Sequence, residues 1–246
     1  MEAGLKEDFV SKWERYFGQA ELPITFYYTD REDRGEKVKV PSGHQCVIGV
    51  LNRVRRGTAL SLNVETVGCA GGKRCLGFPF DTGADFKYFL STGLPGRVEG
   101  ERYKKTPELV EQVVKGWGEF KAPAGNIVFK RWDLLEIDDE PEVAIFFAGP
   151  DVLSALFTLA NFDEPENRVY TPFGAGCSSI VQNPYMEKEK DSPGCIIGMF
   201  DISARPFVER EILTFAAPMK KFRKMVANMD ESFLITRSWE KVKKRI

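Results

Sequence analysis

Cysteines flanked by glycine are the residues of this chain whose type and setting are best suited to chemistry. They are Cys69 in the sequence GCAGG, Cys177 in GAGCSS and Cys195 in PGC. A neighbouring glycine removes one Cβ, so a bulky group can approach the main chain beside the sulfur. A thiolate presented in this way can bind a metal ion, act as a nucleophile or line a ligand site.

The chain contains five cysteines, the other two being Cys46 and Cys75. An odd number of cysteines without a predicted export signal argues against a disulfide framework. Two cysteines separated by two residues are typical of zinc ribbons and ferredoxin-like clusters, and no pair here has that spacing. Free, metal-bound and catalytic thiols all remain open.

Other candidate groups lie close to these cysteines. Lys73 and Arg74 directly follow Gly71-Gly72, and this turn could bind an anionic ligand through its N–H groups and the two cations. Neither glycine-rich nucleotide-binding pattern is present, so a nucleotide is not favoured. His44, the only histidine, is either a base or ligand near Cys46 or a solvent-facing side chain. Cys177 could be a nucleophile, but nothing near it in the sequence supplies a base.

Apolar periodicity predicts the elements that position these groups. It indicates a helix over 9–17 and a strand over 22–28, then a helix capped by Ser42 that carries Cys46 in its first turn and ends at Gly57. Further strands are expected at 59–64, 126–130, 143–148, 195–200 and 211–215, and further helices at 107–116, 150–162, 177–188 and from 218. This order predicts an α+β fold with a mixed sheet and helices packed on it, in a single globular unit over residues 1–246.

Composition limits the possible partners. The chain has 246 residues, with 35 Lys and Arg against 36 Asp and Glu, so its overall charge does not favour nucleic acid or an anionic membrane surface. No run approaches the roughly 18 apolar residues that a membrane-spanning helix needs. The first eight residues are acidic and polar, unlike a signal peptide. We expect a cytoplasmic protein.

The order of several motifs resembles an uncharacterised family, domain of unknown function 169. These motifs are Cys46, CAGG from Cys69 followed by Leu76-Gly77, VAIFFAGP from Val143, Gly176-Cys177, GCIIG from Gly194, Glu211-Ile212 and Ala217-Pro218. The resemblance covers roughly residues 22–224. It implies cysteines at the places of Cys46, Cys69, Cys177 and Cys195 but not of Cys75, and it implies no activity. The chain departs from the family at Lys73-Arg74-Cys75 and at Met199-Phe200-Asp201, where relatives often carry Asn-Arg.

Four cysteines singled out in this way suit an iron–sulfur cluster, with a structural zinc ion as the second choice, because both prefer sulfur ligands. Our first hypothesis is therefore a metal or cluster site at Cys46, Cys69, Cys177 and Cys195, with a redox partner. The second is a metal-free protein that binds a small acidic ligand through Gly71, Gly72, Lys73 and Arg74. Unpaired cysteines also pack as small apolar residues. Sulfur atoms within about 7 Å of one another would favour the first hypothesis, and cysteines buried singly would favour the others. The reaction, if any, is left open.

Overall fold

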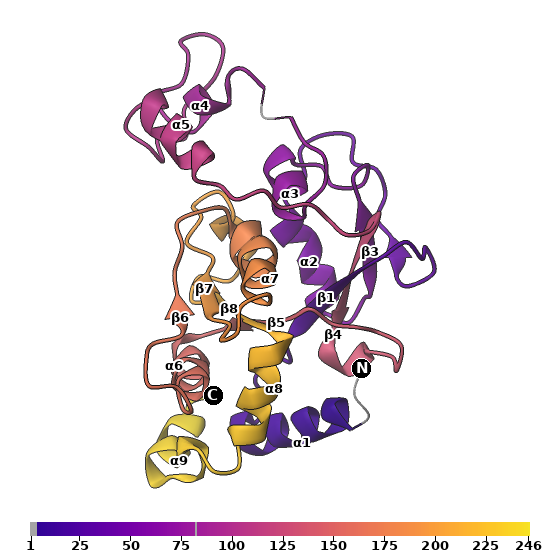
Figure 1. The fold of residues 1–246 in the computed structure, drawn as a ribbon, viewed down its shortest axis with the longest axis vertical. Helices are drawn as coiled ribbons and strands as arrows, with labels where there is room; N and C mark the ends of the chain where they lie inside the picture. Colours follow the sequence, from indigo (N-terminus) through magenta and orange to yellow (C-terminus); the bar gives the residue numbers. More distant parts are fainter. Residues whose placement is uncertain (1–3, 82) are drawn as a thin grey trace.

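The computed structural model describes residues 4–81 and 83–246, whose strands form one mixed sheet (Figure 1). Its eight strands lie in the order β2-β3-β4-β1-β5-β8-β7-β6. The two outermost pairs, β2 with β3 and β6 with β7, are parallel, and all other neighbours are antiparallel. The strands are β1 (Ile24–Thr29), β2 (Glu36–Lys37), β3 (Leu60–Asn63), β4 (Asn126–Arg131), β5 (Val143–Ala148), β6 (Val169–Tyr170), β7 (Cys195–Gly198) and β8 (Leu213–Pro218).

Helices of different lengths cover both faces of this sheet, which confirms the predicted α+β class. The α-helices are α1 (Leu5–Phe17), α2 (Val47–Arg55), α3 (Ala70–Cys75), α4 (Phe86–Phe89), α5 (Pro107–Lys115), α6 (Pro150–Ala160), α7 (Asn183–Glu187), α8 (Met219–Asn228) and α9 (Arg237–Lys243). Single turns occur at η1 (Trp132–Leu134), η3 (Arg205–Phe207) and η4 (Phe233–Ile235). The turn η2 (Ser178–Gln182) is π-helical and leads directly into α7.

Alternation along the central strand β5 separates two hydrophobic cores. Val143, Ile145 and Phe147 point to the face that carries α2, α3 and η2, which we call the α2-side core. Ala144 and Phe146 point to the opposite face, where α1, α6, α8 and α9 pack, and this is the α1-side core. Successive side chains of a strand point to opposite faces, so a strand buried on both sides contributes to both cores.

The segment between α3 and β4 leaves the body of the molecule and returns to it. In Figure 1, α4 and α5 lie apart from the sheet at the top of the view. The chain leaves and returns at one place, where the Ala122 N–H donates to the Gly77 carbonyl at 2.8 Å. Gly77 has φ +77°, and a Cβ there would lie 2.4 Å from the Ala122 nitrogen. Glycine is therefore required for this close approach.

The start of α2 differs from the prediction. Ser42 does not cap the helix; Cys46 is the N-cap residue and the helix begins at Val47. The preceding chain is held elsewhere, because the Gln45 N–H donates to the Gly68 carbonyl at 3.2 Å. Cys46 therefore precedes the first helical turn instead of lying within it.

Residues 70–75 were expected to form a turn, and they form the short helix α3. Glycine is a poor helix former, but at Gly72 the helix packs so closely on α2 that an added Cβ would lie 2.8 Å from a methyl carbon of Val47. Tertiary packing thus favours a helix that the local sequence does not. Within the described residues, no helix combines the length and the apolar composition needed to cross a bilayer.

Candidate functional site

Three cysteines directly precede helical segments on the α2 side of the sheet. Cys46 is the N-cap residue of α2, Cys69 that of α3, and Cys177 that of η2. The Cys69 sulfur accepts a hydrogen bond from the Gly72 N–H at 3.4 Å. Burial raises the pKa of the Cys46 thiol, although N–H groups of the first turn of α2 act in the opposite direction. Backbone N–H groups that point at a sulfur atom stabilise its thiolate form.

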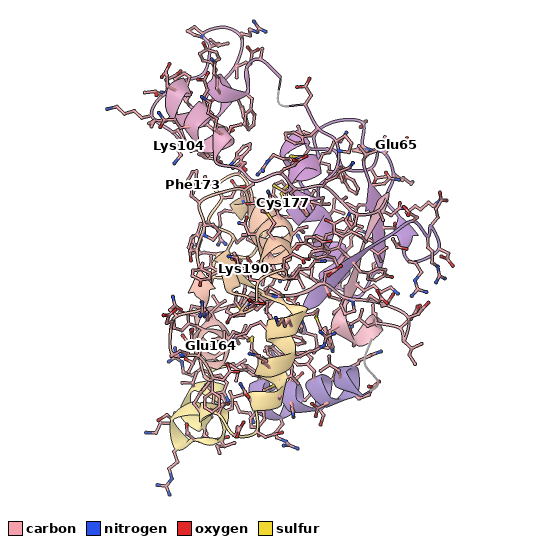
Figure 2. All side chains as sticks on the ribbon, in the orientation of Figure 1. Glu65, Lys104, Glu164, Phe173, Cys177 and Lys190 are labelled. Atoms are coloured by element: carbon pink, nitrogen blue, oxygen red, sulfur yellow. The ribbon has the colours of Figure 1, made fainter. Side chains whose placement is uncertain are left out.

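A fourth cysteine joins this group. Cys75 ends α3 and lies fully buried in the α2-side core beside Cys177, which is labelled in Figure 2. A side-chain hydrogen bond with Cys177 and the nearby positive charge of Arg74 lower the pKa of Cys75, even though its burial opposes this. The same hydrogen bond, together with burial, raises the pKa of Cys177 well above its ordinary value. Of the two thiols, Cys75 therefore loses its proton more readily than Cys177.

The other three cysteines of this side of the sheet all lie close enough to Cys177 to affect its ionisation. Cys75, Cys69 and Cys46 each raise the pKa of Cys177, and Cys69 also raises that of Cys46. Negative charge on any one thiolate therefore disfavours charge on Cys177. We call Cys46, Cys69, Cys75 and Cys177 the thiol group.

Cys195 does not belong to the thiol group. It starts β7 and points into the α1-side core, whereas its neighbour Ile196 points into the α2-side core. It is fully buried, and burial strongly raises the pKa of its thiol. The sheet lies between Cys195 and the other four cysteines, so the expected set of Cys46, Cys69, Cys177 and Cys195 is not brought together.

The thiol group is not packed as tightly as a single metal ion requires. Across residues 4–81 and 83–246, the three candidate ligand atoms that lie within 4.8 Å of one another belong to Glu136, Asp138 and Asp139, not to cysteines. Four sulfurs around one zinc ion lie only about 3.8 Å apart, given a Zn–S bond of about 2.3 Å and tetrahedral geometry. As it stands, this arrangement is too wide for a closed zinc site.

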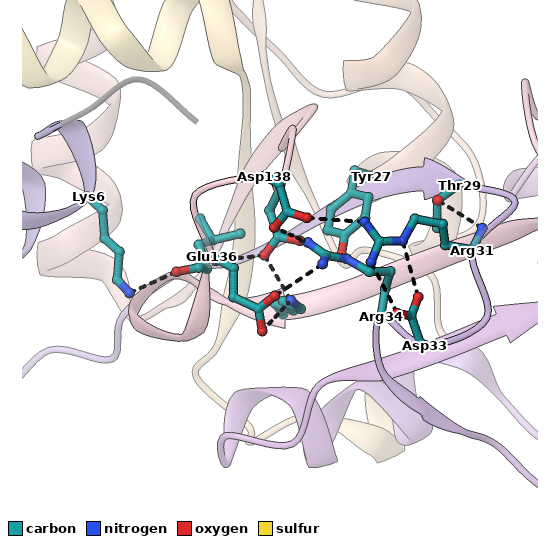
Figure 3. Close-up of polar contacts among 11 residues, drawn as sticks. Lys6, Tyr27, Thr29, Arg31, Asp33, Arg34, Glu136 and Asp138 are labelled. Carbon is teal, nitrogen blue, oxygen red and sulfur yellow. Dashed lines mark hydrogen bonds and ion pairs between the residues drawn. The ribbon is translucent and has the colours of Figure 1, made fainter.

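The acidic group itself is already satisfied by cations (Figure 3). Arg34 donates to Asp138 at 2.6 Å and to Asp139 at 2.7 Å, and it pairs with Glu136 at 3.2 Å. Lys130 Nζ lies 2.8 Å from Asp139. Both cations are largely buried. These contacts describe an ion-pair network that ties the β1–β2 connection to the chain after η1.

The predicted ligand residues of α3 lie on different sides of the helix. Lys73 lines an open groove of about 660 Å³ together with Cys69, and Glu65 and Asp81 also line it. Arg74 lines a second groove, of about 570 Å³, beside Trp117. Gly72 is buried against α2, and a Cβ on Gly71 would meet only the Cys69 sulfur, at 3.8 Å.

Two further residues bear on the site, and His44 takes the solvent-facing of its two expected positions. His44 is exposed and forms no hydrogen bond or ion pair with the described residues. Asp201 accepts a hydrogen bond from the Gly176 N–H at 2.9 Å, just before Cys177, and its charge raises the pKa of Cys46. Sequence reasoning missed Asp201 and set Cys75 aside. The only available signal was the six-residue spacing of Cys75 from Cys69.

The comparisons with known proteins bear on the family and on nothing further. No curated protein and no solved structure matches the chain. A family model does match, over residues 14–228 of the 246: DUF169, described as uncharacterised ArCR. The match spans the strands of the sheet and the whole thiol group. The chain therefore belongs to the DUF169 family.

Proposed function

We propose that this protein binds an iron–sulfur cluster through Cys46, Cys69 and Cys177. The observation that supports the proposal is that these three thiols, at helix starts up to 131 positions apart in the sequence (46 to 177), are near enough for Cys46 and Cys69 to raise the pKa of Cys177. Thiolates are the preferred ligands of such clusters. Cys195, part of the sequence-based set, is left out because it lies on the other side of the sheet.

An iron–sulfur cluster suits this thiol group better than zinc does. In a [4Fe–4S] cluster each thiolate binds its own iron atom, so the sulfurs are spread more widely than around a single ion. In the described chain no three sulfurs of the thiol group lie within 4.8 Å of one another, which is wider than one zinc ion needs and leaves room for a cluster core. Three cysteine ligands would leave one iron position open for a fourth ligand, and Cys75 is the neighbouring thiol that could fill it.

The protein environment supports the proposal in two further ways. The Gly72 N–H points at the Cys69 sulfur, and hydrogen bonds to ligand sulfurs tune a cluster's reduction potential. The apolar α2-side core would shield a cluster from water on the side of Cys177, while the open groove at Cys69 would leave its other side accessible. A cluster held in this way would transfer electrons or act at its open iron position. We expect this chemistry in the cytoplasm, where thiols stay reduced.

The experiment is to purify the protein without oxygen and to measure iron, acid-labile sulfide and the visible absorption spectrum. We expect iron and sulfide in the wild-type protein and their loss in the Cys69→Ser variant. Cys195→Ala is the matched control, and it should keep both. Cys75→Ser distinguishes four cysteine ligands from three. A colourless wild-type protein with no iron after anaerobic reconstitution would rule out the proposal.

The alternative from the sequence was a metal-free protein whose Gly71–Arg74 turn binds an acidic ligand. Lys73 and Arg74 line different grooves, so they do not form one anion site. The Lys73 groove also contains Glu65 and Asp81, whose charges oppose an anion. We therefore do not propose an acidic ligand for the groove that Lys73 lines.

A further inference from the structure

The groove beside Arg74 has the size and composition of a small-molecule site. Its volume of about 570 Å³ falls within the range of about 300–1,000 Å³ typical of ligand pockets. It lies between the end of α3 and the chain that returns from α5 to β4. Aromatic side chains form much of its wall, namely Phe78, Phe80, Trp117 and Phe120. Such walls bind flat, apolar groups.

Arg74 is the main polar group of this groove, and no carboxylate among residues 4–81 and 83–246 pairs with it. Its guanidinium carbon lies 3.7 Å from the centre of the Trp117 ring. Its other contact is with the Cys75 sulfur, at 3.7 Å. A guanidinium stacked flat on an indole keeps its N–H groups directed outward from the ring, where they can bind a carboxylate in bidentate fashion. The stacking thus orients Arg74 without using its hydrogen-bonding capacity.

A second polar group lines the same groove from the π-helical turn. Gln182 is the last residue of η2 and only 4% exposed. Its amide nitrogen has one weak contact, 4.0 Å from the Met186 sulfur, and no group of the described residues donates to its amide oxygen. Within the described chain this oxygen is not among the sealed polar atoms that lack a partner, so it reaches the groove and can accept a hydrogen bond from a ligand there. Such π-helical turns are frequent at functional sites.

The remaining charges of the groove favour an anion. Lys121 and Glu119 line it as well, and neither forms an ion pair with the described residues. With Arg74, the lining carries two positive charges and one negative charge. A ligand with a single negative charge and a flat apolar body would complement both the charge and the aromatic walls.

We propose that this groove binds an aromatic carboxylate, with the carboxylate on Arg74, the ring against Trp117 and Phe120, and a polar substituent on Gln182. This inference is independent of the proposed metal site. It also gives Arg74 a function that its place next to Cys75 does not require.

The test is calorimetric titration of the 246-residue chain with 6-hydroxynaphthalene-2-carboxylate, with its neutral carboxamide and with inorganic phosphate. We expect saturable binding of the carboxylate, and binding of the carboxamide weaker by about tenfold or more, because a charge-assisted bidentate contact is lost. Phosphate should bind far more weakly than the acid, since it makes no contact with the aromatic walls. Equal affinity for acid and carboxamide, phosphate binding as strong as that of the acid, or no binding of the acid would each overturn the proposal.

Variants then place the site. Arg74→Met should weaken binding of the acid by about tenfold or more, and Arg74→Lys should weaken it less, because the charge remains but the bidentate geometry is lost. Lys73→Met is the matched control: it removes the adjacent cation, which lines the other groove, and should leave affinity unchanged. Circular dichroism spectra and melting temperatures verify that each variant is folded. Equal loss of affinity in Lys73→Met and Arg74→Met would refute this placement of the ligand.

Discussion

Replacing Asp139 with alanine should destabilise this protein more than any surface ion-pair substitution. The Asp139 side chain is fully buried, and it accepts hydrogen bonds from Lys130 at 2.8 Å, Arg34 at 2.7 Å and the Glu136 N–H at 2.8 Å. Lys130 is itself only 3% exposed. In Asp139→Ala, the ammonium group of Lys130 stays buried and keeps only its longer contact with Glu136, at 3.5 Å.

The expected loss follows from this burial. Removing one partner of a buried, hydrogen-bonded ion pair costs about 3–5 kcal/mol, because the remaining charge is left uncompensated. Asp138→Ala is the matched control, since Asp138 binds the same Arg34 at 2.6 Å but is 49% exposed. An exposed ion pair contributes about 0–1 kcal/mol. The two neighbouring aspartates should therefore differ by roughly 2–5 kcal/mol.

Urea-induced unfolding monitored by circular dichroism measures both free energies of unfolding. Adding Lys130→Met to Asp139→Ala should restore part of the lost stability, because the buried charge is then removed as well. The reasoning is refuted if Asp138→Ala and Asp139→Ala destabilise the protein equally, or if the second substitution causes a further large loss.

Three other results are expected. Gly72→Ala should cost about 1–3 kcal/mol through overpacking of α3 against α2, while Gly71→Ala, whose Cβ meets no atom closer than 3.8 Å, should be neutral or slightly stabilising in the same unfolding assay. In the native protein at neutral pH, iodoacetamide should label the half-buried Cys69 well before the fully buried Cys195. Peptide mass spectrometry measures the labelling of each cysteine over time. If Cys195 is labelled before Cys69, the buried placement of Cys195 is contradicted. Burial alone would raise the pKa of Asp139, but hydrogen bonds from the Glu136 N–H, Lys130 and Arg34 lower it overall. A carboxyl group whose pKa is lowered by folding stabilises the folded protein above its unfolded-state pKa, which is about 4 for Asp. This contribution to the free energy of unfolding is lost as the pH falls further. Asp139→Asn should therefore flatten the decline of unfolding free energy below about pH 4, and an unchanged slope would contradict this.

Most elements of the fold could be predicted because their apolar periodicity is strong. The strand at 143–148 and the helix at 107–116 both occur as expected, the latter as α5, where the Thr106 hydroxyl accepts from the Leu109 N–H. The helix α3 could not be predicted, because the helix propensity of its residues does not favour it. What stabilises it is the close tertiary contact of Gly72 with α2. Once α3 was missed, the position of Cys75 next to Cys177 was missed with it.

The error at Cys195 has a different physical origin. Strand β7 is buried on both faces, so its sequence does not show which of two adjacent residues points to which core. A shift of one position exchanges the faces. Glycine next to a cysteine indicates close packing, and at Gly194 that packing involves the Tyr170 ring, 2.2 Å from the position of an added Cβ. The motif was therefore structural, and it did not present the sulfur to a site.

The two outermost strands determine how readily this sheet can pair with a strand of another protein chain. β2 and β6 are only two residues long, so each edge of the sheet offers a short row of free backbone groups. Both residues of β2 are charged and exposed, and Lys37 and Glu36 pair with Glu32 and Arg53. Long, flat, uncharged edges promote strand addition between chains and aggregation. The long apolar strands β5 and β8 lie inside the sheet with a neighbour on each side, so the strand order keeps the most aggregation-prone sequences of the chain away from its open edges.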